Sequence, residues 1–130
     1  MKYEFTIPIT PVAKGRARFD SRTKRTYTPT KTRKAEQDIR YFLDMQWKGK
    51  APLTGALCLI VTFFFLRPKS VSAKKRPHHI VKPDASNLLK VVEDSGNGLL
   101  WCDDSQIIMA LCHKEYGDTE GIQFSVEEVP

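Results

Sequence analysis

The sequence predicts one α+β domain over residues 1–130, in which two main helices pack on a mixed or antiparallel sheet. Three observations support this fold class. Several segments have the alternating or continuous apolar pattern of strands, and two have the spacing of amphipathic helices. Strands and helices are interspersed along the chain without an internal repeat or linker. A chain of this length is also long enough to bury one core.

The N-terminal third contains an expected strand, a basic hairpin and the first helix. Residues 3–9 alternate polar and apolar positions, as a half-buried strand does. Residues 14–28 combine a glycine, turn residues and many Lys and Arg, which indicates a loop or hairpin. The helix is expected over residues 28–47, with Thr28 as its cap and Pro29 in its first turn.

The rest of the chain alternates between strand and helix patterns. In residues 55–66, both alternating sets of positions are apolar, which predicts a central strand covered on both faces. The following loop, 67–82, contains two prolines and no acidic residue and should be exposed. Residues 85–96 carry an apolar stripe at helical spacing and end at a glycine. Two final strands are expected over 105–116 and 121–129.

The charge of the chain is divided unevenly along its length. Residues 1–82 carry 19 Lys and Arg against 5 Asp and Glu, and residues 83–130 carry 2 against 10, so their formal charges are +14 and −8. Basic stretches with interleaved aromatics suit a polyphosphate backbone, although a merely solvated basic surface is the alternative. The candidate DNA-binding residues are Lys14, Arg16, Arg18, Arg25, Lys31, Arg33, Lys74, Lys75, Arg76 and Lys82.

Cysteine usage and hydropathy favour a cytoplasmic protein. The three cysteines form no C-x-x-C motif, and their odd number argues against a disulfide framework or a zinc site. The longest apolar run, within residues 55–66, is too short to span a bilayer, and the first ten residues lack a signal-peptide core. No membrane partner is expected.

Acidic residues around the second expected helix are candidates for metal chemistry. Asp84 precedes the helix, Lys90 and Asp94 lie on its polar face, and Asp103 and Asp104 follow shortly after it. Carboxylates from a helix start and a neighbouring strand edge can converge on Mg²⁺, which prefers hard oxygen ligands, while a lysine stabilises the phosphate.

Each of these residues also has a structural explanation. Asp84 or Ser86 could simply cap the helix. Lys90 could be a solvated helix residue, and Asp103 with Asp104 could form a turn before a strand. A nuclease site of the P-D…(D/E)-x-K type is disfavoured, because no acidic residue stands two positions before a lysine downstream of Asp84.

The run KPDASNLLK…DSGNGLLWCDDSQI, residues 82–107, resembles the signature of the RusA family of Holliday junction resolvases, which prophages often carry. The family pattern is approximately K-P-D-x-D-N-L-x-K, then a carboxylate at a helix end, then W-x-D-D-x-Q. KGRARF and RTYTPTKTR are similar to the basic N-terminal part of the family, so the resemblance covers nearly the whole chain. The signature matches at Lys82, Pro83, Asp84, Asn87, Leu88, Lys90, Asp94, Trp101, Asp103, Asp104 and Gln106.

The resemblance implies a nuclease that acts on branched DNA in recombination and repair. Members are homodimers that bind four-way junctions and cut two opposing strands symmetrically with Mg²⁺, for which Mn²⁺ can substitute. Asp84 and Asp104 would bind the metal and, with Lys90, carry catalysis, with Asp103 as the weaker metal candidate. In a dimer, we expect the long apolar strand and Trp47 or Trp101 to contribute to the interface.

The chain departs from the family at Ser86, where the pattern has its second aspartate. Serine is a neutral and weak Mg²⁺ ligand, so the metal site loses one negative charge and one strong oxygen donor. Both a natural variant and a substitution that inactivates the protein fit this position. The alternative function is therefore a catalytically inactive protein that still binds branched DNA.

Overall fold

The computed structural model describes residues 1–130 and confirms the α+β class. Two helices accompany a mixed four-stranded sheet, and a separate two-stranded hairpin precedes the first helix. In chain order the elements are β1 (Lys2–Ile7), β2 (Arg18–Asp20), β3 (Arg25–Tyr27), α1 (Thr30–Trp47), β4 (Ala56–Phe65), α2 (Ala85–Gly96), the 3₁₀ helix η1 (Asp104–Gln106), β5 (Ile107–Tyr116) and β6 (Gly121–Val129).

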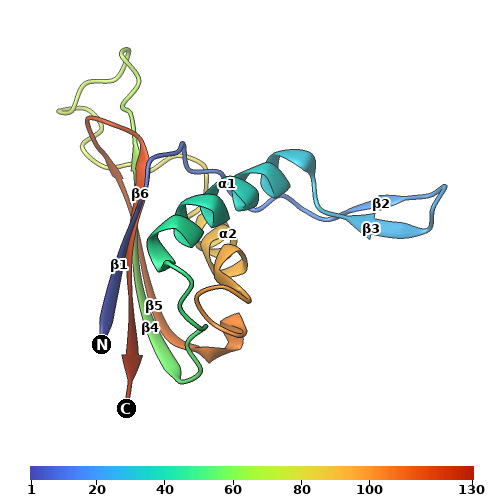
Figure 1. Cartoon of the computed structure of the whole chain (residues 1–130). Helices are drawn as coiled ribbons and strands as arrows, with labels where there is room; N and C mark the ends of the chain where they lie inside the picture. The colour runs from blue at the N-terminus through green and yellow to red at the C-terminus, as the bar shows by residue number, and fades with distance from the viewer.

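The main sheet has the strand order β1-β6-β4-β5. β6 pairs antiparallel with β1 and with β4, whereas β4 and β5 are parallel. A parallel pair needs a crossover connection, and here the crossover contains the loop 67–82, α2 and η1. Both helices lie on one side of the sheet (Figure 1). The crossover therefore holds α2 and the turn after it over β4 and the edge strand β5.

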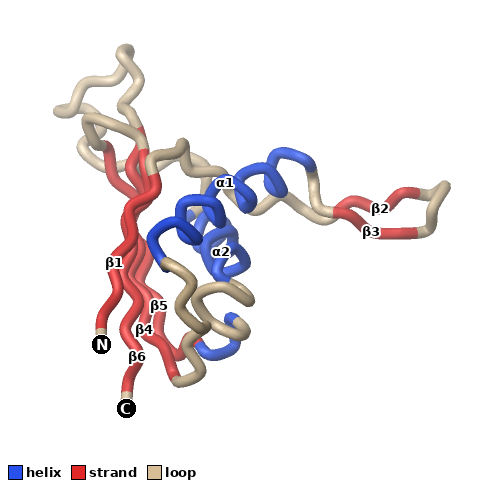
Figure 2. The backbone as a smooth tube through the Cα atoms, in the orientation of Figure 1, coloured by secondary structure: helices blue, strands red, loops and turns tan.

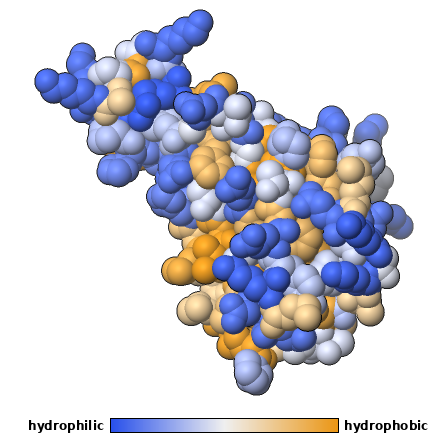
Figure 3. All heavy atoms as spheres, turned by 60° about the vertical axis from the view of Figure 1, so that its left-hand side comes forward, coloured by the Kyte–Doolittle hydropathy of each residue, from blue (hydrophilic) through white to orange (hydrophobic).

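Only one face of β4 is covered, so the expectation that both faces would be covered is wrong. The side chains of Leu57, Val61 and Phe63 are buried under the helices, whereas Ile60 points to the other face and is 47% exposed. No element of the chain packs on that second face (Figure 2). In Figure 3, which brings that side of the molecule forward, apolar atoms form patches among hydrophilic ones.

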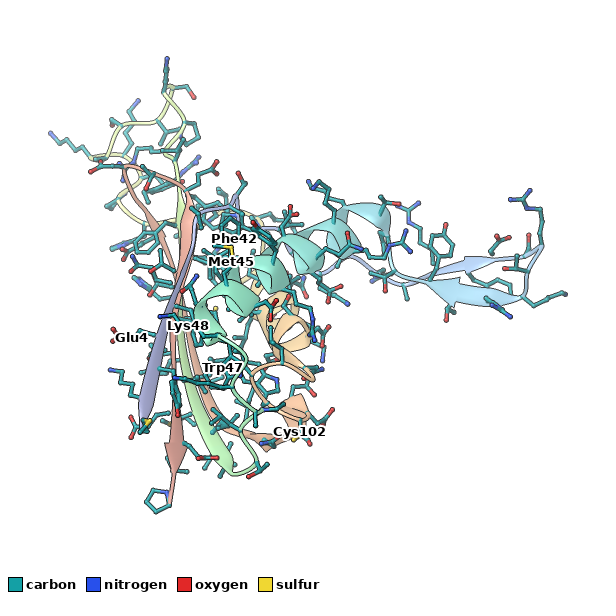
Figure 4. All side chains as sticks on the ribbon, in the orientation of Figure 1. Glu4, Phe42, Met45, Trp47, Lys48 and Cys102 are labelled. Atoms are coloured by element: carbon teal, nitrogen blue, oxygen red, sulfur yellow. The ribbon has the colours of Figure 1, made fainter.

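Helix α1 begins two residues later than expected. Pro29 occupies the N-cap position and no side chain caps the helix, so the predicted cap by Thr28 is not formed. The helix ends at Trp47, whose side chain lies between α1 and the sheet (Figure 4). Trp47 and Trp101 are 2% and 0% exposed, so both side chains belong to the core of the single chain and offer no surface for the dimer contact expected of them.

The basic hairpin β2–β3 projects away from the rest of the molecule (Figure 1). Nearly all of its side chains are exposed. Its two strands pair only with each other, so its place relative to the helices depends on the segments at its base. Neither helix of the chain has the length and apolar content that crossing a membrane requires.

Candidate functional site

The N-terminal end of α2 presents unengaged polar side chains. Asp84 occupies the N-cap position in extended conformation, but its carboxylate makes no capping hydrogen bond. That carboxylate is 55% exposed, and its one ion-pair partner is Lys82, at 3.9 Å. Ser86 is exposed, so neither residue serves as the side-chain cap that was the structural alternative. The carboxylate of Asp84 is therefore accessible to a ligand.

The segment before Asp84 is fixed by a residue that the sequence did not single out. Lys114, on β5, donates hydrogen bonds from Nζ to the carbonyl oxygens of Val81, at 2.8 Å, and Pro83, at 2.9 Å. On the same strand, the Cys112 thiol donates to the carbonyl of Ala85, and burial raises the pKa of that thiol. Edge strand β5 therefore holds the start of α2 in place.

Lys90 lies between two carboxylates near the middle of α2. Its Nζ is 3.5 Å from Oδ2 of Asp104 and 3.7 Å from Oδ1 of Asp94. The negative charge of Asp94, followed by that of Asp104, raises the pKa of Lys90 against the opposing effect of desolvation. The structure thus brings two of the predicted catalytic residues, Lys90 and Asp104, into contact as an ammonium–carboxylate pair.

Asp94 also connects the site to the basic N-terminal segment. Its Oδ2 is 3.1 Å from Nζ of Lys14, which is in turn 3.4 Å from Oε2 of Glu36 on α1. The backbone N–H of Lys14 donates to the carbonyl of Asn87 on α2 at 2.9 Å. Lys14 is therefore engaged within the fold and differs in this from most of the other predicted DNA-binding residues.

Asp104 is positioned by a densely hydrogen-bonded turn. The side chain of Gln106 accepts from the backbone N–H groups of Cys102 and Asp103, at 2.8 and 2.9 Å, and donates to the carbonyls of Leu53 and Gly55. Figure 4 labels Cys102 in this turn, below the helices. The turn fixes the start of η1, and with it the Asp104 carboxylate beside Lys90.

Asp103 has a structural role in the same turn. Its side chain accepts a hydrogen bond from the backbone N–H of Ser105 at 3.0 Å and caps η1, and these bonds to Ser105 lower its pKa. The turn is further anchored by Trp101, whose Nε1 donates to Oδ1 of Asn97. A Cβ on Gly96 would stand 2.4 Å from the Trp101 ring, which explains the glycine at the end of α2.

Glu93 is a charged residue of the site whose role the sequence did not indicate. It is half-buried on α2, next to Asp94 and three residues after Lys90. Burial raises the pKa of Glu93, and the charges of Asp104 and Asp94 add to this effect, whereas Lys90 opposes it.

Asp84 is not part of the Lys90–Asp94–Asp104 cluster. It lies six residues before Lys90 on α2, which corresponds to about 9 Å along a helix axis. No three carboxylate, imidazole or thiol groups of the chain come close enough to hold a metal ion on their own. Mg²⁺ commonly takes only one or two protein carboxylates and completes its shell with water and substrate phosphate, so an ion here would not require a group of three.

Most of the predicted DNA-binding residues have no acidic partner. Among the ten, only Lys14 and Lys82 have a carboxylate within 4.0 Å. The other eight lie on the N-terminal segment with its hairpin, on the start of α1 and in the loop 67–82, so their charge is available to an anionic ligand.

The loop 67–82 is anchored where it returns to the sheet. The ring of His79 is 7% exposed and stacks on Phe65, with 4.2 Å between the ring centroids. Burial and the nearby charge of Lys114 lower the pKa of His79. Arg67 places its guanidinium over the Tyr116 ring at 4.5 Å. The exposed lysines of this loop therefore project from a fixed base.

Comparison with known proteins supplies the family. The chain is 28% identical to the Uncharacterized protein YqaN of Bacillus subtilis (strain 168) over 137 residues, which cover 97% of this chain and 96% of that protein. The family model described as Endodeoxyribonuclease RusA matches residues 8–127, which include both helices and all the candidate acidic and DNA-binding residues. The chain belongs to the RusA family of endodeoxyribonucleases.

Proposed function

We propose that this protein is a metal-dependent, structure-selective endonuclease that resolves four-way DNA junctions by paired symmetric cuts. The observation that carries this proposal is the contact between Lys90 and Asp104, in a RusA-family chain whose Asp84 carboxylate is exposed at the start of the same helix. An ammonium–carboxylate pair and an accessible carboxylate on one helix suit phosphodiester hydrolysis, in which a metal ion and a cation share the developing charge.

The roles follow from the partners of each side chain. Asp84 and Asp104 would hold Mg²⁺, or Mn²⁺ in its place, and the ion would polarise the phosphate and lower the pKa of the attacking water. Lys90 has a raised pKa and stays protonated, so it acts as a cation and not as a base. Asp103 is occupied by its hydrogen bond to Ser105 and contributes to the position of Asp104.

The eight unpaired cations would bind the phosphates of the junction arms. If a dimer engages about 6–10 phosphates, its affinity should fall about 10³–10⁵-fold between 50 and 200 mM salt. The acidic cluster around Asp94 and Glu93 lies at the edge of this basic surface, and the negative charge of Asp94 is offset by Lys14 and Lys90.

The proposal includes a homodimer, because paired symmetric cuts are most simply made by two identical sites related by a two-fold axis. The uncovered face of β4 and β5 is the surface we assign to it. There Ile60 pairs with Leu111 in the strand register, and Met109 lies two residues earlier on β5; all three are about half exposed. Leu111→Glu should give monomers in sedimentation equilibrium at micromolar concentration, where the parent protein should be dimeric.

A catalytically inactive junction-binding protein is the second candidate, and Ser86 favours it. This residue lies in the first turn of α2, where the family pattern places a second aspartate, and it offers only a hydroxyl. The basic surface does not depend on this position, so binding would survive a loss of cutting.

One pair of proteins separates the two candidates. Single-turnover cleavage of a four-way junction should be measured across Mg²⁺ and Mn²⁺ titrations for the parent and for Ser86→Asp. The proposal expects Ser86→Asp to bind the ion more tightly and to cut on the order of tenfold faster or more, since about 1.4 kcal/mol is tenfold in rate. Metal-free affinity should change little. Junction binding without cutting by either protein would leave the inactive binder as the function.

A further inference from the structure

A basic cleft of about 570 Å³ lies between the base of the hairpin, the start of α1 and the segment before Asp84. Proline rings, including those of Pro29 and Pro83, form part of its wall. Its volume is that of a small-ligand site, and a single nucleotide fits within it. None of its lining residues is acidic, and four are cationic: Arg16, Arg18, Lys31 and Lys82.

The cleft is held open by the backbone of residues 14–15. The N–H of Gly15 donates to Oγ1 of Thr32 on α1 at 2.9 Å, and the N–H of Lys14 donates to the carbonyl of Asn87 on α2 at 2.9 Å. A Cβ on Gly15 would stand 3.0 Å from Oγ1 of Thr32 and 3.1 Å from Cγ of Pro29, so a side chain there would crowd α1. One short segment thus joins both helices without filling the space between them.

Both walls of the cleft continue directly into the candidate site. On one side, Lys82 and Pro83 lead to Asp84. On the other side, Lys14 turns away from the cleft toward Asp94, which contacts Lys90. The cleft therefore lies next to the segment that carries Asp84.

We propose that this cleft is a subsite for one phosphodiester of the DNA strand that is cut, within two nucleotides of the phosphate that lies against Asp84. This inference rests on the proposed function, and it specifies where the protein contacts the strand that is cut. Arg16, Lys31 and their cationic neighbours neutralise the phosphate, and the proline rings contact the sugar. Lys74 and Lys75 of the basic loop 67–82, which do not line the cleft, bind other phosphates of the junction.

The test is a charge scan without metal. A single neutral methylphosphonate is moved along one strand of a four-way junction, and the affinity of the parent protein is measured at each position. Neutralising the phosphate in the cleft should weaken binding about tenfold, the effect expected for a charge-assisted contact. Arg16→Ala/Lys31→Ala should abolish this loss at that position alone. Lys74→Ala/Lys75→Ala removes the same charge from the loop 67–82 and should keep the loss at the cleft position.

Repeating the methylphosphonate scan with Asp84→Asn places the cleft relative to Asp84. This variant removes a negative charge that repels the neighbouring phosphate, so it should bind the junction more tightly than the parent protein. That gain in affinity should vanish when the neighbouring phosphate is neutral. The phosphate coupled to Asp84 should lie within two nucleotides of the one coupled to Arg16 and Lys31. The subsite would be overturned if both double variants, Arg16→Ala/Lys31→Ala and Lys74→Ala/Lys75→Ala, were coupled to the same phosphate, or if neither were coupled to any phosphate. It would also be overturned if Asp84 were coupled to no phosphate, or to one more than two nucleotides away. Because no cutting is needed, failure of the nuclease proposal remains a separate result.

Discussion

The two ends of α2 carry the two halves of the family signature, and they are built in opposite ways. At the N-terminal end, Asp84 and Ser86 are exposed, and neither side chain makes a capping hydrogen bond. In the turn after the C-terminal end, the side chain of Gln106 makes four hydrogen bonds, and Asp103 and Trp101 are hydrogen-bonded as well.

This difference separates two reasons for a residue to stand in a signature. Gln106 satisfies four backbone groups and Trp101 fills the core, so together they place Asp104 beside Lys90. The Asp84 side chain makes only a long, exposed ion pair with Lys82, which contributes little to stability, so its carboxylate is available to a ligand. We therefore expect changes at the free end to affect chemistry and changes at the bonded end to affect stability.

The largest effect should come from the free end. Asp84→Asn keeps the shape of the side chain but removes a charged ligand for the metal, so cleavage should fall on the order of 10²–10⁴-fold. The melting temperature should stay the same, because no protein hydrogen bond is lost. Single-turnover kinetics and thermal unfolding of the same preparation measure both. A variant that cuts like the parent would remove Asp84 from the metal site.

At the bonded end, Gln106→Ala should lower the free energy of unfolding by about 2–4 kcal/mol. The change leaves the N–H groups of Cys102 and Asp103 and the carbonyls of Leu53 and Gly55 without their partner. Urea denaturation gives the value, with Gln37→Ala as the control. Gln37 is an exposed residue of α1 whose side chain makes no hydrogen bond, so its loss should cost less than about 0.5 kcal/mol. A cost for Gln106→Ala as small as that of the control would show that the turn is not held by this side chain.

The sequence predicted the elements well because local patterns determine them. The apolar stripe of α2 and the alternation of β1 are visible in single segments, and the structure has both within about two residues of the expected bounds. The uncovered face of β4 was missed, because an apolar run does not say how many faces other elements will cover.

Side chains that act through tertiary contacts were also missed. Nothing in the strand 105–116 distinguishes Lys114, yet it holds two carbonyls at the start of α2. Lys14 was assigned to DNA together with its basic neighbours, but the fold places it against Asp94 and Glu36. These roles depend on residues far apart in the chain, which no local pattern reports.

Asp94 lies between the two ends of the site, and we expect its replacement to have an effect of intermediate size. In Asp94→Asn the pKa of Lys90 should fall, because the charge of Asp94 is the main cause that raises it. A raised lysine pKa stabilises the fold at pH values below its ordinary 10.5, and this contribution is lost as the pH rises through the folded-state value. Nζ titration by NMR in metal-free protein should show the shift. We expect cleavage at neutral pH to fall by no more than about tenfold, because Lys90 stays charged there. An unchanged Lys90 pKa would contradict the coupling.

The smallest effect should come from Glu93, which lies between the two ends and is half-buried beside Asp94. Its pKa is raised above the ordinary 4.5, chiefly by burial, so the folded protein holds the proton of Glu93 more tightly than the unfolded chain does. The stabilisation from the protonated carboxyl is complete below pH 4.5 and is lost as the pH rises through the folded-state value. At pH 7 the ionised carboxylate therefore opposes folding.

Glu93→Gln removes that charge and should stabilise the protein at pH 7 by a few tenths of a kcal/mol, roughly the limit for a partly exposed position. The difference should shrink toward zero as the pH falls below 4.5, where Glu93 is protonated in both states. Urea denaturation of both proteins at several pH values between 3.5 and 7.5 measures it. A variant that is less stable than the parent at pH 7 would mean that the Glu93 carboxylate stabilises the site, by pairing with Lys90, more than its burial costs.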